Sequence, residues 1–241
     1  MDRQKNAVNI LAVDTSSRVL SVALRSRNLE TFETNLEGTP RHSEQLIDLI
    51  EEGLNHLGLK KEDIDQFIWG MGPGSFTGLR IGLSVLKGLH LGLRKRSFGV
   101  SSLDLIALGV GLVTGELIVC IDARRKRIYA ATYRFRNGLI QKVTQDSLFS
   151  FDELKKKIKA ETVLAGDALE NYGTLIRKST GKDAVFLPSS FWYPRALHSI
   201  RLAESKKEWL KPLSLRSMEP SYLRSSEAEE KIQRVAAGRR R

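Results

Sequence analysis

The sequence has one cysteine and no apolar run long enough to span a membrane. Because Cys120 is alone among the 241 residues, no disulfide can form within the chain. The longest apolar stretch, residues 79–93, is interrupted by Ser84, Lys87 and His90, whereas a membrane-spanning helix needs roughly 18 or more apolar residues in a row. We also expect no signal peptide, because the N-terminus has no apolar segment followed by a small-residue cleavage site. These absences predict a cytoplasmic protein.

Histidines are few and scattered, which argues against a metal centre. The chain has four, of which His42 begins a segment with helical periodicity. A metal site on a helix needs a second ligand three or four residues later, and those positions hold Gln45 and Leu46. Neither a serine–histidine–aspartate nor a cysteine–histidine arrangement can be identified from the sequence. We therefore predict no catalytic residues and no metal ligands.

The charge is strongly basic, with 39 lysines and arginines against 28 acidic residues and a net charge of +11. A basic surface suits a polyanionic partner such as RNA. No RNA-binding motif accompanies the charge, so an ordinary solvated surface remains an alternative. Residues 225–241 end in a run of arginines, and we expect them to form a flexible basic tail.

The most informative feature of the sequence is an internal repeat. Residues 10–14 form a short apolar strand that ends in an aspartate, and residues 19–25 form a returning strand with alternating polarity. The same pattern recurs 108 residues later, in residues 118–122 and 128–134. A third strand, a helix, a strand that runs into a glycine, and a second helix are then predicted in each half.

This order predicts an α/β protein built from two βββαβα lobes. A mixed sheet covered by helices and made twice is the duplicated ribonuclease-H-like architecture of the actin, Hsp70 and sugar-kinase superfamily. We expect residues 1–108 to form the N-terminal lobe and residues 109–224 the C-terminal lobe. The glycine-rich segment 109–115 would connect them.

In such a fold, the turns after the first strand of each lobe face a central cleft. Asp14 and Thr15 in the first lobe, with Asp122 and Arg124 in the second, are therefore candidate nucleotide-binding residues. Nucleotide-binding turns usually contain glycines, so that backbone N–H groups reach phosphate oxygens, and neither turn has one. The competing interpretation is that both aspartates cap their own turns through side chain to backbone hydrogen bonds.

Residues 72–82 (Gly-Pro-Gly-Ser-Phe-Thr-Gly-Leu-Arg-Ile-Gly) form the sharpest local motif. A glycine-rich loop at a helix N-terminus can bind an anion, but the spacing matches neither a Walker loop nor a dinucleotide fingerprint. The helix it opens contains Gly78, Gly82, Gly88 and Gly92 and is apolar on nearly every side. Because each glycine weakens a helix by roughly 1 kcal/mol, we expect close packing by another backbone, in the core or at a protein interface.

The sequence resembles the TsaB family, also called glycoprotease-like or M22-like. The resemblance covers most of the chain, is weak between residues 143 and 219, and is most specific in the glycine motif. The segments that carry it are residues 10–16, 42–44, 72–82, 99–103, 121–124 and 220–224.

This resemblance implies a non-catalytic subunit in the biosynthesis of threonylcarbamoyladenosine. Such a subunit pairs with a TsaD-like catalytic subunit, which binds ATP and iron and modifies the adenosine 3′-adjacent to the anticodon of tRNAs that read codons starting with A. A TsaE-like ATPase joins the pair, and tRNA is contacted through the complex. The chain would then need no cofactor of its own, and without its partner we expect it to form a homodimer through the same surface.

The resemblance also maps the pairing surface onto two helices. The predicted interface residues are His42, Ser43, Leu46, Ile50, Ser75, Phe76, Thr77, Leu79, Arg80, Leu83 and Lys87. We predict that Ile81→Asp or Leu83→Asp breaks pairing without unfolding the protein. The alternative is an enzyme, either an M22-like peptidase or a nucleotide phosphatase, that uses a cleft between Asp14 and Asp122.

Overall fold

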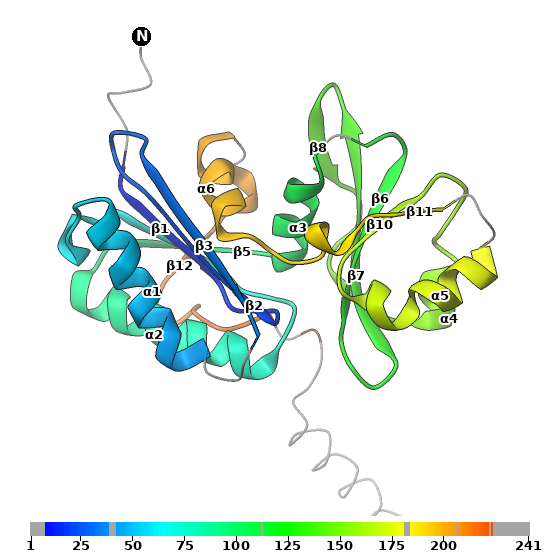
Figure 1. Cartoon of the computed structure of the whole chain (residues 1–241), viewed down its shortest axis with the longest axis horizontal. Coiled ribbons are helices and arrows are strands. Elements are labelled where there is room, and N and C mark those ends of the chain that lie inside the picture. Colours follow the sequence, from blue (N-terminus) through cyan, green and yellow to red (C-terminus); the bar gives the residue numbers. More distant parts are fainter. Residues whose placement is uncertain are drawn as a thin grey trace, which may run out of the picture.

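Two mixed sheets, one in each half of the molecule, form the framework of the structure (Figure 1). The structure, a computed structural model, describes residues 8–38, 42–111, 113–180, 184–205, 207–221 and 223. The first sheet has the order β12-β5-β4-β1-β2-β3. Its strands are β1 (Ile10–Asp14), β2 (Val19–Arg25), β3 (Thr31–Glu37), β4 (Gln66–Gly70), β5 (Arg96–Val100) and β12 (Lys211–Leu213).

The second sheet repeats this plan, with the order β11-β10-β6-β7-β8 and β9 paired to β7. Its strands are β6 (Glu116–Asp122), β7 (Arg127–Arg136), β8 (Leu139–Lys142), β9 (Ser147–Ser150), β10 (Val163–Ala165) and β11 (Val185–Phe186). In the first sheet β1 pairs antiparallel with β2 and parallel with β4, and in the second β6 pairs antiparallel with β7 and parallel with β10. The order β3-β2-β1-β4-β5 is therefore reproduced as β8-β7-β6-β10-β11. This confirms the predicted duplicated ribonuclease-H-like, actin-like fold.

Helices cover both faces of each sheet. They are α1 (His42–His56), α2 (Phe76–Leu93), α3 (Ser102–Val110), α4 (Phe151–Lys155), α5 (Ala168–Thr180) and α6 (Ala196–Ser205), with 3-10 turns η1 (Lys61–Asp63), η2 (Ser189–Phe191) and η3 (Lys207–Trp209). Helices α1 and α2 lie on one face of the first sheet, and α3 and α6 lie between the two lobes (Figure 1). Within the described ranges, no helix combines the length and the apolar character needed to cross a membrane.

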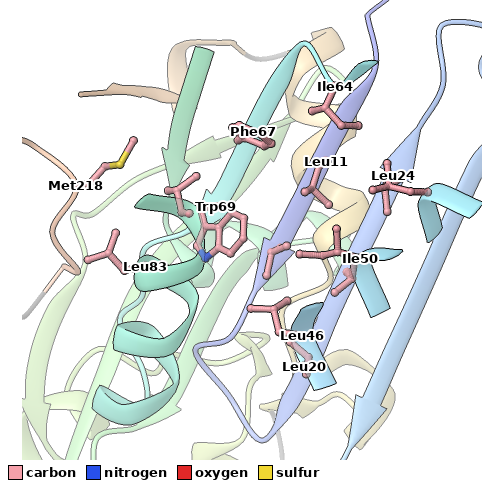
Figure 2. Close-up of a cluster of buried hydrophobic side chains, with 14 residues drawn as sticks. Leu11, Leu20, Leu24, Leu46, Ile50, Ile64, Phe67, Trp69, Leu83 and Met218 are labelled. Atoms are coloured by element: carbon pink, nitrogen blue, oxygen red, sulfur yellow. The ribbon is translucent and has the colours of Figure 1, made fainter. Parts of the chain in front are cut away.

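The two-residue period of the strands divides the core into layers. Leu11 and Val13 of β1 pack into a cluster with residues of α1 and α2, which Figure 2 shows in close-up. The intervening Ile10 and Ala12 point to the opposite face and pack against α6. In the second lobe, Cys120 is fully buried in the layer under α4 and α5. Every residue of β1 is therefore buried, which fits its continuous apolar sequence.

The lobes do not divide where the sequence predicted. The boundary at residue 108 falls inside α3, and α3 packs on the second sheet through Leu103, Ile106 and Ala107. After the second lobe, the chain returns to the first: α6 packs on β1 and β2, and β12 pairs antiparallel with β5. The segment assigned to the C-terminal lobe therefore completes the N-terminal one. The physical reason is that β1 is buried on both faces, so its second face needs a helix that the first 108 residues do not supply. The predicted tail, residues 225–241, lies outside the described residues.

Candidate functional site

The carboxylate of Asp14, at the end of β1, is sealed inside the protein. The residue has 0% of its surface exposed. Oδ1 accepts hydrogen bonds from the backbone N–H of Ser16 at 2.8 Å and from its hydroxyl at 2.7 Å, and Oδ2 accepts from the Ser102 hydroxyl at 2.7 Å. Burial raises the pKa of this carboxyl, and the bonds from both serines partly oppose that shift. Asp14 therefore caps its own turn and ties β1 to the start of α3.

The glycine motif is filled by the chain's own β1–β2 turn. The N–H of Ser75 donates to the carbonyl oxygen of Ser16 at 2.6 Å, and the Thr15 hydroxyl donates to the carbonyl of Gly78 at 2.8 Å. A Cβ placed on Gly74 or Gly78 would collide with the same turn, because backbone atoms of Ser16 and Thr15 occupy the space. The close backbone approach that the glycines predicted is therefore real at this end of α2, and the partner in it is this chain.

The corresponding turn of the second lobe is more open. Oδ1 of Asp122, at the end of β6, accepts from the N–H of Arg124 at 2.8 Å, and Oδ2 accepts from the Asn171 amide at 2.9 Å. The N–H of Asp122 donates to Asp167 at 2.9 Å. Burial, together with the charge of Asp122, raises the pKa of Asp167 to about 6. Asp122 also caps its turn, but the side chain of Arg124 is 83% exposed.

Arg18, in the β1–β2 turn, reaches α5 of the second lobe. Its guanidinium lies 3.2 Å from Glu170 at the start of α5 and 3.0 Å from Glu37, and 5.0 Å from the ring centroid of Tyr193. Of the predicted turn residues, Asp14 and Thr15 are fully buried, whereas Asp122 is partly exposed. No sequence signal identified Arg18, Asp167, Glu170 or Tyr193, since their contacts join segments that are far apart in the chain.

The predicted pairing residues fall into two groups. Leu46, Ile50, Leu79 and Leu83 are all at most 8% exposed and belong to the core of the first lobe. They hold α1 and α2 on the sheet and do not form an outer surface, which corrects their assignment as contact residues. The rest with described side chains lie at the surface: Ser75, Thr77 and Arg80 are exposed, and Phe76 and Lys87 are half-buried. The side chains of His42 and Ser43 lie outside what the structure describes.

One side of α2 faces outward, and apart from Arg80 and Leu91 its exposed residues are small. We call Thr77, Ser84, Gly88, Leu91 and Gly92 on this side the α2 strip. A Cβ on Gly88 or Gly92 would meet nothing within 4 Å, and Leu91 is 60% exposed. The glycines of α2 therefore serve two purposes. Those at its start accommodate the β1–β2 turn, whereas those towards its end leave a shallow outer surface.

Comparison with known proteins assigns the chain to a family. A family model described as TsaD, tRNA N6-adenosine threonylcarbamoyltransferase, matches residues 37–232. The tRNA threonylcarbamoyladenosine biosynthesis protein TsaB of Escherichia coli strain K12 is 30% identical over 93% of this chain and 98% of its own length. The chain belongs to the TsaB branch of this family. It therefore takes part in the biosynthesis of threonylcarbamoyladenosine in tRNA.

Other relatives agree with this assignment. TsaB of Bacillus subtilis strain 168 is 27% identical over 93% of the chain and 97% of its own length. A solved structure of a Pseudomonas aeruginosa protein, described as uncharacterized with similarity to the peptidase YEAZ, superposes with a TM-score of 0.75. It is 24% identical, and the match covers 90% of this chain and all of that one. That structure shares the fold of this chain. Among the described residues of this chain, no cluster of histidine, cysteine and acidic side chains could hold a metal ion.

Proposed function

We propose that this chain is a non-catalytic scaffold subunit for threonylcarbamoyl transfer. It pairs with a TsaD-like catalytic subunit and activates transfer to the adenosine 3′-adjacent to the anticodon of tRNAs that read codons starting with A. ATP and iron belong to that partner, a TsaE-like ATPase joins the pair, and this chain carries no cofactor of its own.

The closed β1–β2 turn is the observation that carries this proposal. A phosphate-binding turn must offer free N–H donors to an anion. In the β1–β2 turn the N–H of Ser16 donates to Asp14 and the N–H of Val19 donates to the Ser17 hydroxyl. An enzyme that used Asp14 would need its carboxylate within reach of substrate, and both oxygens are engaged in a buried site. The peptidase or phosphatase alternative would therefore require this turn to be rebuilt before any reaction.

The α2 strip supports pairing as the remaining role. Small residues on a helix let another backbone approach closely, and an exposed leucine beside them supplies apolar area for an interface. Ile47 of the neighbouring α1 is also 42% exposed, although large apolar residues are usually buried. We expect the TsaD-like subunit, or a second copy of this chain when that subunit is absent, to cover the α2 strip.

The test is the substitution Gly88→Arg, with Thr174→Arg on the exposed side of α5 as the matched control. Arginine at position 88 enters open space, so the fold is preserved while a bulky cation lies in the strip. We expect pairing with the TsaD-like subunit to weaken about tenfold or more, which corresponds to about 1.4 kcal/mol, and the control to pair normally. Leu83→Asp is unsuitable because it places a charge in the core.

Gel filtration with the partner, circular dichroism and a tRNA modification assay give the readouts. Loss of pairing and of modification in Gly88→Arg, with a native spectrum, supports the proposal. Normal pairing by Gly88→Arg would show that the strip is not the interface. Turnover of ATP or of a peptide by the purified chain, lost in Asp122→Asn, would instead establish the enzyme alternative. Small-angle scattering of the chain alone tests the homodimer, and a concentration-independent monomer rejects it.

A further inference from the structure

The second lobe carries two clusters of positive charge that the pairing role does not use. Residues 124–127, in the β6–β7 turn, are all cationic, and so are residues 155, 156, 157 and 159, at and after the end of α4. Acidic residues only flank the two clusters: Asp122 pairs with Arg124 at 3.5 Å, and Glu153 and Glu161 border residues 154–160. All of these cations are exposed except Arg127, which is partly buried.

Strand pairing brings the two clusters onto one part of the surface. Arg127 lies opposite Ser150 in the β7–β9 ladder, and Ile128 lies opposite Phe149. The ammonium of Lys157 is 5.2 Å from the ring centroid of Phe149. Because paired residues of neighbouring strands are about 5 Å apart, this lysine lies close to the start of β7 and to the turn before it. Figure 1 shows this turn at the lower end of the second lobe.

The turn holds its cations in an unusual conformation. Arg124, Arg125 and Lys126 have φ angles of 61°, 50° and 60°, so three consecutive residues other than glycine are left-handed. Glycine or asparagine would adopt this backbone at lower cost. The chain instead places long cationic side chains there. Strain of this kind in a native protein is found preferentially at functional sites.

We propose that this basic surface, formed by Arg124, Arg125, Lys126, Lys155, Lys156, Lys157 and Lys159, binds the phosphate backbone of the tRNA substrate. The inference rests on the proposed function, because it assumes that the chain acts beside the catalytic subunit while tRNA is bound. Exposed cations without a rigid base-reading element suit phosphates, which position a nucleic acid without reading its sequence. An anionic membrane is the less suitable partner, since stable attachment needs an amphipathic helix or lipid anchor as a second signal and α4 has five residues.

The experiment compares two fourfold variants of the full-length chain that remove the same charge. The first carries Arg125→Asn, Lys126→Asn, Lys156→Gln and Lys157→Gln, with asparagine chosen because it tolerates the left-handed turn. The control carries Lys60→Gln, Lys61→Gln, Arg94→Asn and Arg96→Gln, which neutralise four exposed cations of the first lobe. Arg94 is itself left-handed, with a φ of 51°, so each set includes a left-handed residue.

The readout is fluorescence anisotropy of a labelled tRNA transcript that reads a codon starting with A, between 50 and 300 mM salt. Each phosphate contact contributes roughly 0.7 to 0.9 to the slope of log affinity against log salt. We therefore expect the first variant to lower the slope by about 3 and to bind at least about tenfold more weakly at about 0.15 M salt. The control should change binding by less than about threefold. Pairing of both variants with the TsaD-like subunit should be unchanged.

Equal losses in the two variants would overturn the inference, because net charge alone would then explain binding. Unchanged tRNA binding by the first variant would overturn it as well. So would selective loss of binding to vesicles of phosphatidylglycerol and phosphatidylcholine with tRNA binding intact, which would assign the surface to membranes. Failure of the unsubstituted chain to pair with the TsaD-like subunit would reject the proposed function instead, and gel filtration detects it separately from tRNA binding.

Discussion

Two glycines of α2 are predicted to respond in opposite ways to the same substitution. Gly78 faces the β1–β2 turn, and an added Cβ would lie closer than 3.0 Å to the carbonyl oxygen of Thr15. Gly88 lies ten residues later on the exposed side of the helix, where a Cβ meets nothing within 4 Å. Alanine at either position removes the same backbone freedom from the unfolded chain. The difference between Gly78→Ala and Gly88→Ala therefore isolates the packing of the turn.

The magnitudes follow from these surroundings. At Gly88, alanine should stabilise the protein by about 0.5 to 1 kcal/mol, the usual difference in a helix interior. At Gly78 the helical gain is smaller because the residue lies in the first turn. Over-packing typically costs about 1 to 3 kcal/mol. Because the obstructing atom belongs to the backbone, whose movement would also strain the Asp14–Ser16 bonds, we expect a net loss of about 2 kcal/mol.

Urea unfolding followed by tryptophan fluorescence measures both variants. Trp69 is a useful reporter because it is 1% exposed and packs in the same core cluster as Leu83 of α2. We expect the midpoint to rise for Gly88→Ala and to fall for Gly78→Ala. If Gly78→Ala were as stable as the unsubstituted protein, the β1–β2 turn would not be packed against α2 as described, and the main support for a closed cleft would be lost.

Two further predictions concern the aspartates beside the turns. Asp14→Asn should change the free energy of unfolding by less than about 1 kcal/mol, because asparagine keeps an oxygen acceptor for Ser16. Asp14→Ala should lower it by roughly 2 to 4 kcal/mol, because the buried groups of Ser16 and Ser102 lose their partner. Urea unfolding of both variants tests this, and equal losses would contradict it. For Asp167, the folded pKa of about 6 exceeds the ordinary 3.8, so its contribution to stability is present at low pH and is lost as pH rises from about 4 to about 6. Asp167→Asn should remove that decline, and identical pH profiles for the two proteins would show that this carboxyl is not perturbed.

Much of the fold was predictable because the repeated strands and helices have local patterns of apolar and polar residues in the sequence. The first hairpin of each lobe, the helix that His42 begins and the helix after the glycine motif all appear in the structure. The elements that the sequence did not reveal are β5, α3, β9, β11 and β12. Three of these strands have four residues or fewer. Strands this short have too few residues for alternation to be recognised, and only pairing with a neighbour defines them.

The lobe boundary could not be predicted for a different reason. Local patterns do not show which sheet α6, residues 196–205, covers. That choice depends on the free face of β1 and on ion pairs such as Arg25 with Glu204 and Arg195 with Glu33, which join positions more than 160 residues apart. The same limit explains why Leu79 and Leu83 were expected at an interface. An apolar helix is compatible with burial by its own lobe or by another chain, and only the tertiary structure distinguishes the two.

The two lobes started from the same plan, and their equivalent turns now differ in a way that follows from their neighbours. In the first lobe, the residues opposite the turn are glycines, so the backbone of Thr15 and Ser16 can settle against α2 and the carboxylate of Asp14 is enclosed. In the second lobe, the carboxylate of Asp167 accepts a hydrogen bond from the N–H of Asp122. The turn after it projects outward, with Arg124, Arg125 and Lys126 exposed. In the first turn the N–H groups of Ser16 and Val19 are engaged by side chains of the turn itself and are not available to a phosphate. Projection of the second places cations on the outside, where they can meet the phosphates of a large polyanion but not those of a nucleotide enclosed between the lobes.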